Sequence, residues 1–82
     1  MSDYLLSKQV AGKCGLSEEE ARAFEERGVI HGIAKNGYRY YSASDCYRLR
    51  GILRLMRDKG LPLAKAQDLV DGARRVTPAV GR

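Results

Sequence analysis

The chain has 82 residues, the length of one small domain, which leaves no room for a second. Its 15 Lys and Arg residues outnumber its 10 Asp and Glu residues, and the net charge of +5 favours polyanionic partners. No apolar run has the length of a secretion signal or approaches the ~20 residues that cross a bilayer. We therefore expect a cytoplasmic protein that does not span a membrane.

The first third of the chain predicts two short helices separated by a tight turn. Apolar residues recur at helical spacing within residues 8–14, and Gly15 is placed to end that helix in a left-handed conformation. Ser17 and Glu20 then form a capping-box pattern, which starts a second helix that ends near Gly28. Two helices joined in this way predict a helix-turn-helix.

A basic, tyrosine-rich hairpin is predicted next. Asn36 and Gly37 both tolerate positive φ, as a type I′ turn requires, so residues 33–34 and 38–41 can pair across it. The charge changes sign at this part of the chain. Residues 17–27 hold five glutamates against two arginines, whereas residues 31–59 hold seven Lys and Arg against two Asp.

A third helix is predicted directly after the hairpin. Ser42 precedes Asp45 by three residues, a capping-box-like pair that would start a helix at the end of the strand. Apolar side chains then recur at steps of three and four up to Lys59, and Gly60 closes the helix.

A fourth helix and a tail complete the predicted fold. Pro62 suits the first turn of a helix whose apolar spacing continues to Gly72, and residues 73–82 are expected to form a flexible tail. The predicted fold class is mostly α, a winged helix-turn-helix of four helices with one two-stranded β-hairpin wing, in a domain of residues 1–72. Its core is expected to contain Leu6, Val10, Leu16, Ala21, Phe24, Ile30, Tyr41, Leu49, Ile52, Leu53, Leu63 and Leu69.

Catalytic and metal-binding chemistry is not indicated. Cys14 and Cys46 form no CxxC pair and have only His31 as a further soft ligand, so no metal site, cofactor or redox motif is predicted. The cysteines are expected to be buried as small apolar residues, with a lone disulfide as the alternative. His31 has no evident nucleophile or carboxylate partner and is expected in a surface turn. The chain is therefore not expected to be an enzyme.

These motifs resemble the N-terminal winged-helix DNA-binding domain of the MerR-type bacterial transcription regulators. The similarity covers roughly residues 4–72. It is most specific over Asn36-Gly37-Tyr38-Arg39-x-Tyr41-Ser42-x-x-Asp45, Leu49-Arg50-x-Ile52 and Gly60-Leu61-Pro62-Leu63, where the family has its wing, third helix and the start of its fourth. The family continues into a coiled-coil dimer and an effector region that these residues do not match. We expect a monomer, or a dimer without a coiled coil.

The resemblance implies a set of DNA-binding residues. In the family the second helix enters the major groove, which gives Arg22 a groove or backbone role, and the wing holds phosphates, which gives Tyr38 and Arg39 backbone roles. Arg50 and Arg54 of the third helix either reach the flanking backbone or belong to a solvated basic face. The predicted function is a small transcription regulator that binds double-stranded DNA. Its candidate DNA-binding residues are Arg22, Lys35, Tyr38, Arg39, Arg50 and Arg54.

The second helix departs from the family. Glu18, Glu19 and Glu20 occupy positions where members usually have proline, a basic or polar residue, and threonine. Glutamate can accept a hydrogen bond from cytosine N4, but a cluster of three faces repulsion by the phosphates and suits base recognition poorly. The three residues either complement the positive end of the helix dipole or bind a basic protein. The second interpretation gives the alternative function, a MerR-like fold diverted to protein binding as an adaptor, antirepressor or chaperone modulator.

Overall fold

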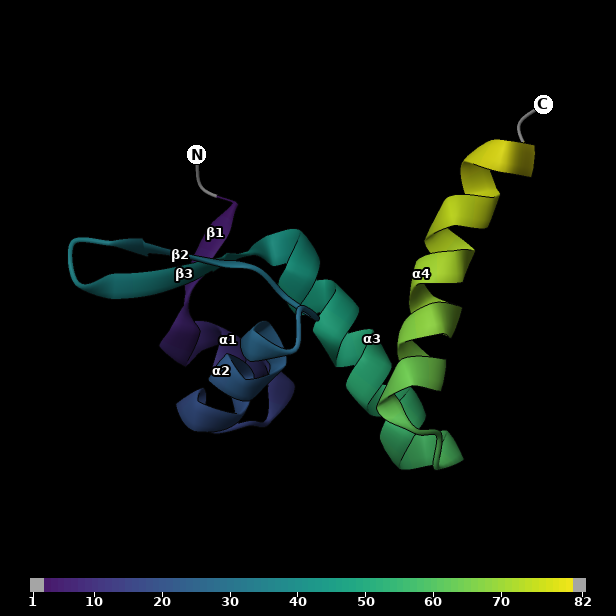
Figure 1. Cartoon of the computed structure of the whole chain (residues 1–82), viewed down its shortest axis with the longest axis horizontal. Coiled ribbons are helices and arrows are strands. Elements are labelled where there is room, and N and C mark those ends of the chain that lie inside the picture. Colours follow the sequence, from purple (N-terminus) through teal and green to yellow (C-terminus); the bar gives the residue numbers. More distant parts are fainter. Residues whose placement is uncertain (1–2, 81–82) are drawn as a thin grey trace. The chain divides into compact units, whose positions relative to one another are not determined.

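The computed structural model describes the backbone of residues 3–80 and the side chains of residues 3–72, and it divides into two compact units, residues 1–50 and 51–82. Figure 1 shows the elements in chain order: β1 (Tyr4–Leu6), α1 (Ser7–Cys14), α2 (Glu18–Glu26), β2 (Gly32–Lys35), β3 (Tyr38–Ser42), α3 (Ala43–Lys59) and α4 (Leu63–Val80). The predicted fold class, a mostly helical winged helix-turn-helix, is confirmed.

The helix-turn-helix is closed by the predicted caps. Gly15 has a φ of 71° and ends α1 in the left-handed region. The Oγ atom of Ser17 accepts from the Glu20 amide at 3.1 Å, and Oε1 of Glu20 accepts from the Ser17 amide at 2.9 Å. Both arms of the capping box are therefore formed, and the Glu20 carboxylate is held at the start of α2.

The hairpin forms as predicted. Asn36 and Gly37 have φ angles of 53° and 80°, the left-handed pair that a type I′ turn needs. Strands β2 and β3 pair in antiparallel fashion on either side of this turn, with Lys35 opposite Tyr38 at its base.

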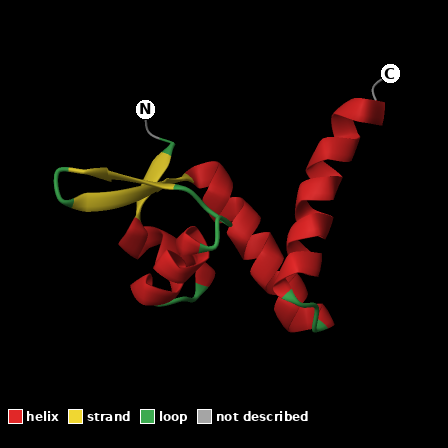
Figure 2. Cartoon of the chain, viewed as in Figure 1, coloured by secondary structure: helices red, strands yellow, loops and turns green. Residues whose placement is uncertain are grey.

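A third strand that the sequence analysis missed completes the sheet. In β1, Tyr4 lies opposite Ser42 and Leu6 opposite Tyr40, so the strand order is β1-β3-β2 with β3 in the centre. The strands are drawn in yellow in Figure 2. A strand of three residues is too short to show an alternating pattern, and its partner is distant in the sequence. The wing is therefore anchored by backbone pairing on both sides of β3.

The core of the first unit lies between the sheet and the helices, where α1 packs against α2 and β3 (Figure 1). Burial is confirmed for five of the predicted core residues here, whereas Leu6, Leu16 and Phe24 are only half-buried. The buried side chains of this unit are Val10, Ala11, Ala21, Val29, Ile30, Tyr41, Cys46 and Leu49.

In the second unit, Ile52 and Ala66 are buried, which confirms Ile52 as a core residue. The prediction for Leu69 is wrong, because its side chain is 49% exposed. The covered stripe of α4 runs through Ala66 and the half-buried Val70, and Leu69 lies beside it.

The helices of the second half begin largely as predicted. Ser42 Oγ accepts from the Asp45 amide at 3.0 Å and caps α3. The Asp45 carboxylate binds the backbone amide of the exposed His31 at 2.9 Å and Arg48 at 3.1 Å.

The predicted end of α4 at Gly72 is wrong, since the helix continues to Val80. Ala73, Arg74 and Arg75 are good helix formers, and one internal glycine costs only about 1 kcal/mol. The last two residues of the predicted tail, 81 and 82, lie outside the described residues.

The two cysteines are free thiols. Cys46 is buried and Cys14 half-buried, with its Sγ atom 4.0 Å from the Cys46 carbonyl oxygen. Burial, reinforced by the neighbouring Cys46, raises the pKa of Cys14 to about 12. The thiol is therefore protonated at neutral pH.

Candidate nucleic-acid interface

One carboxylate joins α2 to the central strand of the sheet. Oε1 of Glu25, near the end of α2, accepts from Arg39 Nε at 2.8 Å and from the Tyr41 hydroxyl at 2.8 Å. Arg22 Nε lies 3.4 Å from the same oxygen. Arg39 and Tyr41 are two residues apart on β3, so both side chains project from one face of the sheet. We call these four residues, Arg22, Glu25, Arg39 and Tyr41, the Glu25 cluster.

The side chains of the Glu25 cluster stabilise one another's protonation states. The hydrogen bond from Arg39 lowers the pKa of Glu25, and the Tyr41 hydroxyl and both arginine charges act in the same direction, against the effect of burial. Burial and the bond to Glu25 raise the pKa of Tyr41 to about 12. Tyr41 is therefore a neutral donor at physiological pH, and two arginines share one ionised carboxylate. The cluster keeps an excess positive charge.

Gly32 of β2 makes room for this arrangement. It lies opposite Tyr41 in the sheet. A Cβ atom on Gly32 would lie 2.7 Å from Cε1 of Tyr41 and 2.8 Å from Oε2 of Glu25. Such distances are too short for van der Waals contact, and the Tyr41 ring is fully buried. A side chain at position 32 would therefore displace the cluster.

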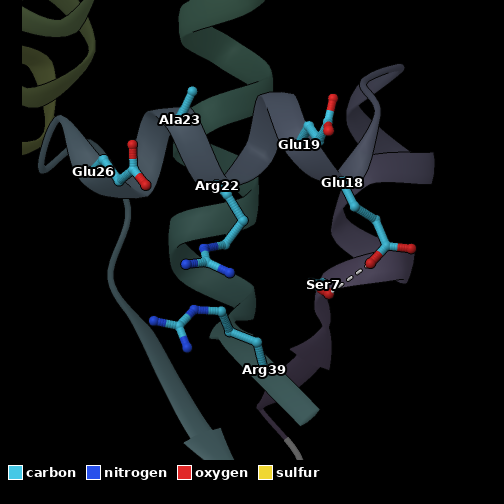
Figure 3. Close-up of a pocket in the computed structure, with 7 residues that line it drawn as sticks. All are labelled: Ser7, Glu18, Glu19, Arg22, Ala23, Glu26 and Arg39. Carbon is cyan, nitrogen blue, oxygen red and sulfur yellow. Dashed lines mark hydrogen bonds between the residues drawn. The ribbon is translucent and has the colours of Figure 1, made fainter.

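An open pocket lies in front of the two arginines (Figure 3). The guanidinium groups of Arg22 and Arg39 extend into it from α2 and β3, with side chains 51% and 31% exposed. The other lining residues come from α1 and α2 and are Ser7, Glu18, Glu19, Ala23 and Glu26. The pocket therefore presents donors from two elements beside several carboxylates.

A family model of the MerR helix-turn-helix regulatory proteins matches residues 6–73, which is most of the chain. The chain belongs to the MerR family. At the level of this family it is a DNA-binding transcription regulator, and the family is one of regulators rather than enzymes. No curated protein and no solved structure matches the chain significantly.

The three glutamates at the start of α2 have different surroundings. Oε1 of Glu18 accepts from the Ser7 hydroxyl at 3.2 Å, and Glu20 belongs to the capping box. The carboxylate of Glu19 has no hydrogen bond or ion pair among the residues that the structure describes. In Figure 3, Glu18 turns toward Ser7 while Glu19 projects from the other side of the helix.

The remaining predicted DNA-binding residues lie outside the Glu25 cluster. Lys35 and Tyr38 are exposed at the end of the MerR-type wing, Tyr38 to 63%. Arg50 and Arg54 are exposed on α3, four residues apart. The structure thus brings together Arg22 and Arg39 of the predicted set.

Glu25 is the site residue that the sequence analysis missed. A glutamate late in a helix resembles a solvated surface acid. Two signals point to it: its spacing of three from Arg22, which places both on one helix face, and the alternation that puts Arg39 and Tyr41 on one sheet face.

Over the part of this MerR chain with described side chains, no three ligand-type side chains gather in a way that would hold a metal ion. A search of the described helices likewise finds none with the length and hydropathy of a membrane span.

Proposed function

We propose that this MerR-family chain binds double-stranded DNA with α2 and the wing acting together, and that Arg22 and Arg39 form a phosphate clamp. The observation that supports this proposal is that Arg22 and Arg39 contact the same carboxylate, that of Glu25. Both arginines approach its carboxylate through Nε. Their terminal nitrogens are then available in the pocket, where a guanidinium fork can bind phosphate oxygens in bidentate fashion.

The other basic residues extend this surface in the proposed complex. Lys35 and Tyr38 at the end of the wing contact the sugar-phosphate backbone, where Lys supplies charge and Tyr a hydroxyl donor. Arg50 and Arg54, exposed on α3, reach the flanking backbone. A single copy of such a domain covers only a half-site, so tight binding requires a second copy or a partner protein beside it.

The salt dependence of DNA binding tests the proposal. The logarithm of the binding constant falls with the logarithm of salt concentration, with a slope of about 0.9 for each neutralised phosphate. With a random-sequence duplex, we expect the slope to shrink by about one unit in Arg22→Ala and in Arg39→Ala. Arg57→Ala removes an exposed arginine that is not one of the candidate DNA-binding residues, and serves as the charge control. A slope that neither Arg22→Ala nor Arg39→Ala changes would contradict the clamp.

A second function has its own support in the pocket. Glu18, Glu19 and Glu26 outnumber the two arginines there, and a basic protein segment would complement them. The double change Glu18→Lys, Glu19→Lys separates the two functions. It should strengthen duplex binding if DNA approaches α2, and abolish binding of an arginine-rich peptide if a basic protein does.

A further inference from the structure

The sheet has a second face, which points away from the Glu25 cluster. Side chains alternate along a strand, so Tyr40 lies on the face opposite to that of its two neighbours in the cluster. Ile33 of β2 is directly across from Tyr40. Tyr4 of β1 shares this face, because its partner Ser42 is two residues from Tyr40. Lys35 shares it too, two residues after Ile33. We call Tyr4, Ile33, Lys35 and Tyr40 the outer face of the sheet.

The outer face is hollowed and open to solvent. Its four residues line one pocket together with Asn36 of the hairpin turn. Tyr4 is 49% and Ile33 50% exposed, and Tyr40 is half-buried between the outer strands. Single exposed apolar side chains are ordinary, whereas a contiguous group of them indicates a binding surface. The residues of this pocket therefore point to a ligand.

The chemistry of the lining indicates what that ligand is. Two tyrosine rings and an isoleucine supply flat and apolar surface, and Lys35 and Asn36 supply a positive charge and an amide. Among the described residues that line this pocket there is no carboxylate, whereas three glutamates line the pocket in front of the two clamp arginines. A ligand that combines aromatic rings with negative charge complements such a lining.

We infer that the outer face binds single-stranded DNA, with bases stacked on Tyr4 and Tyr40 and a phosphate held by Lys35. Every base has a π face, and aromatic side chains within a basic surface bind single strands by stacking. In a duplex the neighbouring bases cover these faces, so only unpaired bases can reach the tyrosines. DNA is the nucleic acid of the family to which the chain belongs.

Two other occupants fit the outer face less well. An acidic peptide would satisfy the charge of Lys35 but would not in general supply rings for both tyrosines. A second copy of the chain, packed face to face, would bring two Lys35 side chains toward each other, and like charges repel. A single strand supplies both the rings and the negative charge in every nucleotide.

Single-stranded DNA is a ligand beyond the proposed duplex complex. The clamp residue Arg39 projects from the opposite face of the sheet, since it precedes Tyr40 on β3. Lys35, at the end of the wing, belongs to both surfaces and contacts a phosphate in either complex. Loss of a clamp arginine should therefore weaken duplex binding and leave single-strand binding largely intact.

Fluorescence anisotropy with a labelled oligothymidylate of about 12 nucleotides, which does not pair with itself, measures single-strand binding. The full chain is compared with Tyr4→Leu, which removes the ring and keeps an apolar side chain, and with Tyr4→Phe, which keeps the ring. We expect Tyr4→Leu to weaken binding about five-fold or more and Tyr4→Phe to bind within about two-fold of the wild type.

Tyr47→Leu is the matched control. Tyr47 is 70% exposed on α3, outside the sheet, so Tyr47→Leu should bind oligothymidylate as the wild type does. An abasic strand of the same length carries the phosphates without the bases. We expect it to bind about five-fold or more weakly than oligothymidylate, because it cannot stack.

Several results would overturn the inference. Equal binding by the wild type and Tyr4→Leu would show that the ring is not used, and equal binding of the abasic strand would show that charge alone attracts the ligand. Tighter binding of oligouridylate, or of a copolymer of glutamate and tyrosine, would assign the outer face to RNA or to an acidic protein. A dimer in sedimentation that Tyr4→Leu dissociates would assign it to a second copy.

Arg22→Ala separates this inference from the proposed function. If Arg22→Ala changes the duplex salt slope and leaves oligothymidylate binding unchanged, the two surfaces are separate, as inferred. If it weakens oligothymidylate binding as much as Tyr4→Leu does, the single strand occupies the clamp and the inference is wrong. A duplex slope that no clamp variant changes contradicts the clamp alone.

Discussion

Arg39 Nε and Glu25 Oε1 lie 2.8 Å apart, and this contact connects the central strand of the wing to the second helix of the helix-turn-helix. The same oxygen receives the Tyr41 hydroxyl and faces Arg22. A pair that is 31% and 15% exposed is better shielded from water than an ordinary surface ion pair. The contact therefore orients Arg39 as well as neutralising part of its charge.

Replacing Glu25 distinguishes orientation from charge. Glu25→Gln removes a negative charge, so simple electrostatics predicts tighter DNA binding. We expect weaker binding instead, by about 1 kcal/mol, because a neutral amide oxygen holds both arginines less firmly than the ionised carboxylate does, and they must then be ordered on binding. Duplex titration measures the change, and Tyr41→Phe, which keeps the carboxylate, is the control with a smaller expected loss. Tighter binding by Glu25→Gln would show that the carboxylate only repels DNA.

The stability of the fold should depend on Glu25 in acid. Its pKa is lowered in the folded protein from the ordinary value of 4.5, chiefly by the Arg39 hydrogen bond. The contribution of the ionised carboxylate is therefore present above about pH 4.5 and is lost as the pH falls through the lower, folded-state pKa. We expect the difference in unfolding free energy between the wild type and Glu25→Gln to be constant near neutrality and to shrink below pH 4.5. Urea titrations at a series of pH values measure it.

A methyl group at position 32 should disturb the Glu25 cluster. Gly32→Ala places Cβ against the buried Tyr41 ring, and we expect a loss of stability of about 1–3 kcal/mol together with weaker DNA binding. Gly12→Ala is the matched control. It lies within α1 with open space around its Cβ position, so alanine should stabilise the helix by about 0.5–1 kcal/mol. Equal melting temperatures for the two variants would contradict the close approach.

Two leucines should differ sharply in thermal or urea unfolding. Leu49 is fully buried, and Leu49→Ala should lower the unfolding free energy by about 3–5 kcal/mol. Leu69 is half exposed, so Leu69→Ala should change it by less than about 1 kcal/mol. A large effect at Leu69 would mean that another surface covers it in solution.

The Cys14 thiol should react slowly in the folded protein. Its pKa of about 12 leaves little thiolate at neutral pH, whereas the unfolded chain has the ordinary value of 9.0. We expect alkylation by iodoacetamide at pH 8 to be at least about ten-fold slower for native Cys14 than for the urea-unfolded chain. Equal alkylation rates of Cys14 in the native and the unfolded protein, followed by peptide mapping, would contradict the raised pKa of this thiol.

Much of this fold is predictable because its signals are local. The capping box of Ser17 and Glu20 and the left-handed pair Asn36 and Gly37 each act within a few residues, and both form as expected. The strand β1 has no such signal, since it exists through pairing with β3 from a distant part of the chain. The position of Leu69 depends on which stripe of α4 is covered, and spacing alone does not decide between neighbouring stripes.

The candidate site was less predictable than the fold. Arg22 and Arg39 are identifiable from the family resemblance, but their shared partner depends on how α2 meets the sheet. The three glutamates look equivalent in the sequence. The structure distinguishes them by their partners, because Glu18 accepts from the Ser7 hydroxyl and Glu20 belongs to the helix cap. These partners depend on position in the helix, which the identical residue types do not reveal.

The Glu25 bridge has a mechanical consequence. Because one carboxylate bonds to both α2 and β3, it fixes the spacing between the helix and the wing. Under the proposed binding mode, a duplex must present a groove and an adjacent strand at this spacing or deform to match it. The energy of that deformation depends on base sequence even where no side chain touches a base. The protein would then discriminate between DNA sites partly by groove width.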